Sequence, residues 1–145
     1  MSRRVAREVA LQVIFQITEG DNPPGTALEE AWVRNSQANL DPEIPCGPLE
    51  EGDRIFIQKL VELILQQQAA IDEHIARLSL DWPLERIGTV ERAILRLAFG
   101  ELSLGDVPPS IVANEAVELA KRYGDDNSRR FINGIVGSAI REREG

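Results

Sequence analysis

Residues 114–134, NEAVELAKRYG followed by DDNSRRFING, decide the fold of this chain. Their apolar side chains recur at intervals of three and four residues, which is typical of amphipathic helices. The pattern predicts one helix that Gly124 stops, a short polar turn, and a final helix that begins near residues 126–128 and runs to about Arg143.

The same periodicity covers the first part of the chain. It predicts a helix over residues 3–18, with Ser2 as a candidate N-cap. Thr26 with Glu29 has the spacing of a capping box, which predicts a second helix that starts at Thr26 and ends at about Ser36.

The middle of the chain combines a turn-rich stretch with a long helical pattern. Prolines and glycine in residues 38–50 predict an irregular loop. Asp53 is expected to start a long helix, and its length predicts a kink or break near Gln67. Asp81-Trp82-Pro83 should interrupt the chain again, because the residue before a proline avoids the α region.

The remaining helix is predicted over residues 90–104, capped by Thr89 and stopped by Gly105. Nowhere do apolar and polar residues alternate over five or more positions, so we expect no strand. The sequence therefore predicts an all-α protein, a compact bundle of six to seven helices, in a single domain over residues 1–145.

Composition narrows the class of protein. The single cysteine, Cys46, excludes an internal disulfide and fits a reducing, cytoplasmic location, and with only one histidine, His74, a zinc site is excluded. No apolar run approaches the roughly 18 residues that span a bilayer. Acidic side chains have no companion base or nucleophile, and no glycine loop of a nucleotide-binding type occurs, so we expect neither catalysis nor a cofactor.

The net charge of −8 first argues against a nucleic-acid partner, but its distribution changes that interpretation. Residues 1–18 hold three arginines against one acid, a balance of +2; residues 19–80 hold 12 acids against 4 bases, a balance of −8; residues 81–145 hold 11 against 9, a balance of −2. The acid excess therefore lies in the middle. Local potential, rather than net charge, decides where a polyanion binds.

The two helix openings carry the candidate binding residues. Arg3, Arg4 and Arg7 place positive charge at a helix N-terminus against the helix dipole, so they need an external anion or an acidic partner. Phe15 follows on the same edge of that helix, and is either a core residue or a stacking platform for an unpaired base.

The final helix opens with cations beside an aromatic ring. Backbone N–H groups of Asn127, Ser128 and Arg129 are expected to be unpaired and to offer a phosphate site, while Arg130 adds charge. Phe131 adds either packing or a stacking face. Such a combination suits an anion and a flat base, which indicates RNA.

Both ends of the chain resemble the NusB family of transcription antitermination factors. The resemblance rests on RRVARE at residues 3–8 with the following Ala10-Leu11-Gln12 and Phe15, and on four later segments. These are VERAILRLA at 90–98, Val107-Pro108, NEAVELAK at 114–121 and FINGIVG at 131–137. Residues 20–50 depart from the family pattern, being longer and richer in proline.

The resemblance implies a non-enzymatic, all-helical protein that pairs with NusE, a protein of the small ribosomal subunit. The pair would bind single-stranded boxA RNA of ribosomal RNA leader transcripts, within an RNA polymerase antitermination complex that also supports rRNA maturation. Arg3, Arg4 and Arg7 would then contact phosphates. Independently of the resemblance, we expect the cations at the openings of the first and final helices to converge on one unpaired RNA strand.

The resemblance also assigns individual residues. Glu91 and Arg92 would face NusE, with Glu91 pairing a basic residue there. The family often has an acid where this chain has Asn127, and an aspartate there would repel phosphate. Asn114 and Asn133 are interpreted as buried structural asparagines, and Gly134 as a site of close helix approach.

Two rival functions stay open on the sequence alone. A similar module precedes 5-methylcytosine ribosomal RNA methyltransferases in longer proteins, although this chain ends at Gly145 without a nucleotide-binding α/β half. The second rival is an interaction module without RNA binding, for example a homodimer that hides its arginines.

Overall fold

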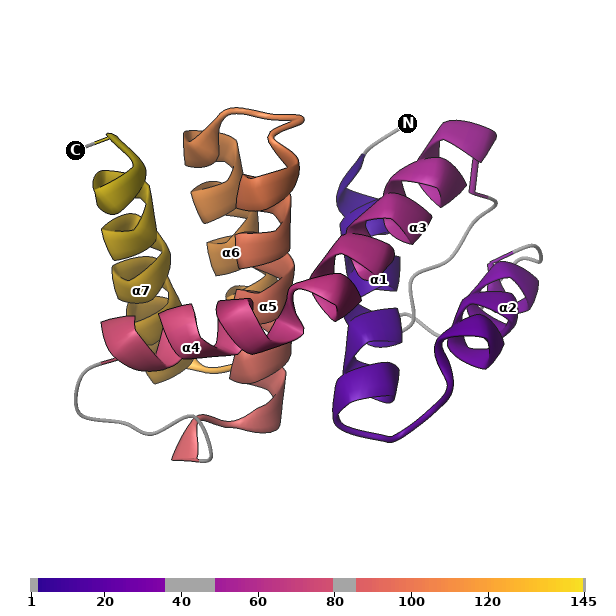
Figure 1. The fold of residues 1–145 in the computed structure, drawn as a ribbon, viewed down its shortest axis with the longest axis horizontal. Helices are drawn as coiled ribbons and strands as arrows, with labels where there is room; N and C mark the ends of the chain where they lie inside the picture. The colour runs from indigo at the N-terminus through magenta and orange to yellow at the C-terminus, as the bar shows by residue number, and fades with distance from the viewer. Residues whose placement is uncertain (1–2, 36–48, 80–85, 145) are drawn as a thin grey trace. The chain divides into compact units, whose positions relative to one another are not determined.

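The computed structural model of the chain describes residues 3–35, 49–79 and 86–144. These residues form seven helices and no strand (Figure 1), which confirms the all-α prediction. The helices are α1 (Arg3–Thr18), α2 (Pro24–Arg34), α3 (Glu51–Gln66), α4 (Gln68–Leu78), α5 (Thr89–Leu104), α6 (Pro109–Tyr123) and α7 (Asp126–Glu144). None of these helices is long and apolar enough to cross a membrane. Ser2, most of the 38–50 loop and the predicted break at Asp81-Trp82-Pro83 lie outside the described residues.

The chain groups into two compact units, Met1–Glu62 and Leu63–Gly145. In the first unit, α1 packs against α2. The predicted apolar face of α1 is buried, with Val9, Val13 and Ile14 fully inaccessible to solvent. The assignment of a single domain to residues 1–145 stays a prediction.

The second helix begins earlier than the sequence predicted. Pro23 is its N-cap and Pro24 its first residue, so the predicted capping box of Thr26 and Glu29 is wrong. Proline suits the first helical position because its fixed φ is already helical and its missing N–H has no partner to lose. The helix ends at Arg34, close to the predicted end.

The long middle helix begins and breaks near the predicted places. It starts at Glu51, two residues before the predicted Asp53, whose Oδ2 accepts a hydrogen bond from the backbone N–H of Glu50 at 3.3 Å. The predicted break near Gln67 is confirmed, because this residue separates α3 from α4.

In the second unit, α5, α6 and α7 lie side by side, and α4 crosses α5 and α7 (Figure 1). Every residue of α5 from Ala93 to Leu102 is buried. Arg96 is among them, and its guanidinium forms two hydrogen bonds with Asp72 of α4, at 2.8 and 3.1 Å. A buried arginine needs such a partner, because an unpaired charge in the core is strongly destabilising.

The ends of α5 test two predictions. Gly105 has a φ of 74° and stops the helix in the left-handed conformation, as predicted. At the other end, Gly88 is the N-cap and Thr89 is already helical without a side-chain cap, so the predicted Thr89 cap is wrong. Glycine is an acceptable N-cap, although it brings no capping side chain.

Gly124 ends α6 as predicted, and a steric constraint favours glycine at this position. Its backbone is extended, with φ −119° and ψ −154°, which other residues also adopt. A Cβ there, however, would lie 2.8 Å from the Cβ and Oγ of Ser128 and 3.0 Å from the Ala120 carbonyl oxygen. By contrast, a Cβ at Gly134 would meet no atom within 4 Å, so the predicted close helix approach at Gly134 is wrong.

We therefore expect Gly124→Ala to lower the free energy of unfolding by about 1–3 kcal/mol, because the turn between α6 and α7 must shift to admit the methyl group. Gly134→Ala is the matched control, since replacing an exposed helical glycine by alanine raises the free energy of unfolding by about 0.5–1 kcal/mol. Urea unfolding of both variants measures the difference. Equal stabilities would contradict the steric role of Gly124.

Glu142 links the C-terminal end of α7 to α4 through hydrogen bonds and ion pairs. Glu142 accepts hydrogen bonds from Arg77 at 2.7 Å and shares a 2.8 Å contact with the His74 ring. The Arg77 hydrogen bond, followed by that of His74, lowers the pKa of Glu142 to about 2. The imidazole of His74 also lies edge-on to Phe99 of α5.

This depressed pKa predicts a pH-dependent contribution to stability. The contribution is present above the unfolded-state pKa of about 4.3 and is lost as the pH falls toward the folded-state value. We expect Glu142→Gln to lower the Tm at pH 7, and the difference from the unmodified protein to vanish as the pH falls from about 5 to about 2. Glu144→Gln, in the same exposed last turn, serves as the control and should change the Tm at neither pH. A difference for Glu142→Gln that persists at pH 2 would contradict the ion-pair explanation.

Candidate nucleic-acid interface

The candidate residues fall into both compact units. Arg3, Arg4, Arg7 and Phe15 belong to the first unit, and the candidates of α5 and α7 belong to the second. The two groups of candidates are described separately, each within its own unit. The convergence of the α1 and α7 openings on one strand stays a prediction.

The three N-terminal arginines differ in exposure. Arg3 and Arg4 are exposed in the first turn of α1, whereas Arg7 is buried at 5% exposure beside the equally buried Glu8. Arg3 and Arg4 are therefore accessible at the start of the helix, whereas Arg7 belongs to its packed side.

Arg3 has the acidic partner that the helix dipole requires. Its Nη1 donates to the Gly52 carbonyl at 3.2 Å and lies 3.4 Å from Asp53 Oδ1, and its guanidinium lies over the Phe56 ring with Cζ 4.6 Å from the centroid. Sequence reasoning missed Asp53 and Phe56. Their spacing of three places them on one face of α3, but no local signal links them to an arginine 50 residues earlier.

Phe15 is partly exposed on α1. Along its edge of the helix, Arg4 is exposed while Arg7 and Leu11 are buried. One side of the ring therefore packs on the protein while another part reaches solvent, an arrangement that suits both interpretations of Phe15.

The opening of α7 uses its backbone donors internally. Asp125 Oδ1 accepts the Ser128 N–H at 2.8 Å, and the Asp125 carbonyl accepts the Arg129 N–H at 3.1 Å. The prediction that these N–H groups are unpaired is therefore wrong for Ser128 and Arg129. Hydrogen bonds from the backbone and hydroxyl of Ser128 hold the pKa of Asp125 below its ordinary value. Asp125 is the cap that satisfies the helix end in place of a phosphate.

Ser128 connects the openings of α7 and α5. It is buried, and its hydroxyl donates to Glu91 Oε2 while lying 3.1 Å from Asp125 Oδ1. Arg92, next to Glu91, donates to the Ile87 carbonyl at 3.3 Å. Glu91, a candidate for partner binding, and Ser128, a candidate for RNA binding, are thus joined by one hydrogen bond.

The structure divides the remaining α7 candidates between two sides of the helix. At about 100° per residue, Phe131 lies about 40° from Asn127, whereas Arg129 and Asn133 lie roughly 120–160° from Asn127. Buried Ser128 and Ile132 separate the two groups on the core side. Exposed Arg130 lies between them on the solvent side.

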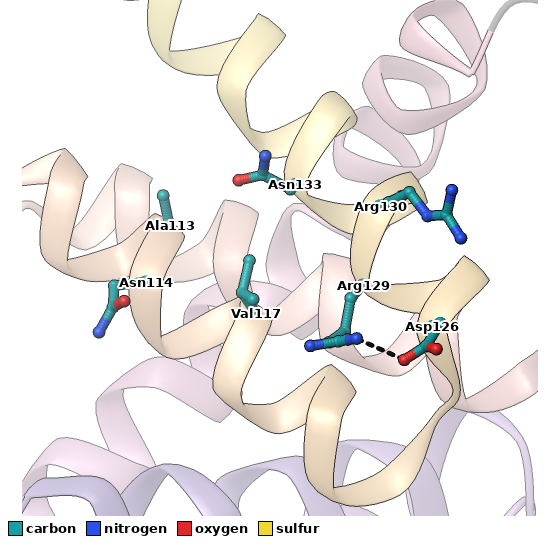
Figure 2. Close-up of a pocket in the computed structure, with 7 residues that line it drawn as sticks. All are labelled: Ala113, Asn114, Val117, Asp126, Arg129, Arg130 and Asn133. Atoms are coloured by element: carbon teal, nitrogen blue, oxygen red, sulfur yellow. Dashed lines mark hydrogen bonds and ion pairs between the residues drawn. The ribbon is translucent and has the colours of Figure 1, made fainter.

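A polar cleft of about 570 Å³ lies between α6 and α7 (Figure 2). Its lining is Ala113, Asn114 and Val117 of α6 with Asp126, Arg129, Arg130 and Asn133 of α7. Figure 2 shows the Arg129 guanidinium near Val117, joined to Asp126 by an ion pair, while Arg130 points away from both.

Asn114 and Asn133 are exposed at this cleft, so their interpretation as buried structural residues is wrong. Both carboxamides face solvent because they lie on the flanks of α6 and α7, outside the buried face that includes Ala116 and Ile132. The cleft therefore combines two cations, one acid and two amides.

Comparison with known proteins shows a match to one protein family over nearly the whole chain. It matches the NusB family over residues 4–141. The transcription antitermination protein NusB of Symbiobacterium thermophilum is 42% identical, with 100% of this chain and 93% of that protein covered. The corresponding protein of Bacillus subtilis is 41% identical, with 95% and 94% covered.

The fold agrees with solved structures. A crystal structure of the antitermination factors NusB and NusE in complex with double-stranded RNA aligns with a TM-score of 0.80 and 26% identity, covering 97% of this chain and 96% of that one. The sequence match over residues 4–141 and the shared all-helical fold lead to the same assignment. The chain belongs to the NusB family.

Proposed function

We propose that this protein is a transcription antitermination factor that binds boxA RNA of ribosomal RNA leader transcripts together with NusE. In doing so it promotes read-through by RNA polymerase and maturation of rRNA. The observation that carries the proposal is the match, across 97% of this chain, to a NusB that was crystallised with NusE and RNA. Exposed arginines at the openings of both α1 and α7 support it.

The proposed RNA surface uses the accessible candidates directly. Arg3 and Arg4 of α1, with Phe15 beyond them, form one part. Asn127, Arg130 and Phe131 of α7 form another, because they share the flank and solvent side of that helix. Each arginine that contacts a phosphate of a single strand contributes about 0.7 to the salt dependence of binding.

Three further candidates contribute less directly to RNA binding. Arg7 and Ser128 are too buried to contact RNA directly, and they support the helix openings that carry the exposed residues. Arg129 is held by Asp126 in the α6–α7 cleft, so its contribution to binding is smaller than that of Arg130.

The NusE contact is proposed at the opening of α5. Glu91 is partly exposed, and its Oε2 is already held by Ser128, which fixes the direction of the carboxylate. Arg92 lies beside it. An ion pair of Glu91 with a basic residue of NusE would therefore be coupled, through Ser128, to the opening of α7.

The mechanism is assembly of a complex in the cytoplasm rather than catalysis. In this proposal the protein and NusE each supply part of the RNA contact, so we expect the pair to bind more tightly than either protein alone. Among the residues that the structure describes, no three His, Cys, Asp or Glu side chains gather as metal ligands.

A fluorescence-anisotropy titration tests the proposal. Labelled boxA RNA, a scrambled RNA and a duplex of the boxA sequence are titrated with the protein, with and without NusE, at two salt concentrations. We expect the single-stranded boxA RNA to bind most tightly and NusE to raise the affinity. Equal affinity for the scrambled RNA would mean that the protein binds RNA only by charge attraction. Tighter binding of the duplex would overturn the assignment of a single-stranded ligand. A dimer that does not bind RNA would favour the alternative function of an interaction module.

Asn127 provides a second prediction. Asn127→Asp adds a negative charge beside the proposed phosphate path, and we expect about two- to fivefold weaker binding of boxA RNA, since an exposed charge of this kind is worth up to about 1 kcal/mol. Gln66→Glu is the matched control, because it adds the same charge at an exposed position of α3 that is no candidate for RNA binding, and it should leave the Kd nearly unchanged. An unchanged or tighter Kd for Asn127→Asp, or an equal loss for both variants, would contradict the proposed path.

A further inference from the structure

Arg3 is an exposed cation of the first unit whose guanidinium contacts three neighbouring groups. Its guanidinium lies over the Phe56 ring at 4.6 Å, while Nη1 contacts the Gly52 carbonyl at 3.2 Å and Asp53 Oδ1 at 3.4 Å. An arginine at a helix end usually samples many rotamers. Here one face and one edge of the planar group are fixed.

The groups that hold Arg3 are themselves anchored. Phe56 is buried at 6% exposure, and the Asp53 side chain is only 9% exposed. The second carboxylate oxygen of Asp53 accepts the Glu50 N–H at 3.3 Å, in the first turn of α3. The position of the guanidinium is therefore set by the packed part of the unit.

The guanidinium of Arg3 has a second face, which points away from Phe56. The Arg3 side chain is 46% exposed, although Phe56 covers one face and Nη1 is occupied. We take this exposed area to include the face that points away from Phe56. A flat cation with one face covered by an aromatic ring has the geometry on which nucleobases stack.

We propose that the outer face of the Arg3 guanidinium, backed by Phe56 and oriented by Asp53, is a stacking platform for an unpaired base of the bound RNA. The inference rests on the proposed RNA-binding function and changes the role of Arg3 from phosphate contact to base contact. Asp53 offsets part of the positive charge, which weakens phosphate attraction but leaves the stacking face intact. Arg4, exposed one residue further on, lies nearby to serve the backbone of the strand.

Substitution of Arg3 by lysine and by alanine tests the platform. Lysine keeps the charge but has no planar face, so both Arg3→Lys and Arg3→Ala are expected to weaken boxA binding by about five- to hundredfold, the range for loss of one stacked base. A phosphate contact instead predicts that Arg3→Lys binds like the unmodified protein, and that Arg3→Ala alone lowers the salt slope by about 0.7.

A matched control lies in the same unit. Arg54 also stacks on an aromatic ring, with its Cζ 5.5 Å from the Trp32 centroid. Arg54→Lys removes a comparable arginine–aromatic contact without touching Arg3, and should leave the Kd unchanged. Thermal unfolding of the variants shows whether each remains folded at the temperature of the titration.

A second readout reports stacking directly. With 2-aminopurine placed in turn at each position of the boxA RNA, the unmodified protein should change the fluorescence at one position through stacking, and Arg3→Lys should abolish that change. If the unmodified protein binds boxA RNA and Arg3→Lys binds equally well with the same fluorescence pattern, the platform is refuted while the proposed function stands. If the unmodified protein does not prefer boxA RNA, the proposed function itself fails.

Discussion

The contacts of the buried Ser128 hydroxyl connect three helices of the second unit, α5, α6 and α7. The hydroxyl donates to Glu91 at the opening of α5, it lies against the Asp125 carboxylate that caps α7, and it occupies the space that a side chain at Gly124 would need. This buried residue thus lies against the end of α6 and ties the start of α7 to α5, and together with the buried apolar residues of α7 it sets the rotation of that helix about its axis. That rotation places Asn127 and Phe131 on one flank of the helix and Arg129 and Asn133 on the other.

Several acids of this chain, whose net charge is −8, serve to orient arginines. Several carboxylates are used within the protein, each holding one guanidinium in place. The pairs are Arg3 with Asp53, Arg77 with Glu142, Arg96 with Asp72, and Arg129 with Asp126. Only the Arg96 pair is deeply buried; the others orient cations at the surface, where such pairs add little stability. Their main consequence is geometric, because a held arginine presents a defined face or edge.

Capping residues in this protein serve structure and the proposed site together. Asp125 accepts the Ser128 N–H at the start of α7, a donor that an external phosphate would otherwise bind. Anion binding there must therefore rely on side chains rather than on the backbone of the helix end. In the first unit, Asp53 accepts a hydrogen bond at the start of α3 and also orients Arg3. In α3 the residue that accepts a backbone hydrogen bond at the helix start thus also orients a candidate RNA-binding side chain.

The sequence by itself determined the helical class, the break at Gln67, the stops at Gly105 and Gly124, and the membership of the NusB family, because periodicity, turn residues and motifs are local properties. It misplaced the starts at Pro24 and Thr89, where proline and glycine took the place of the expected side-chain caps. Only the tertiary structure decided that Arg7 is buried, that Asn114 and Asn133 are exposed, and that Arg3 has Asp53 and Phe56 as partners. These outcomes depend on contacts between residues far apart in the chain, and no local pattern encodes which helix covers a given face.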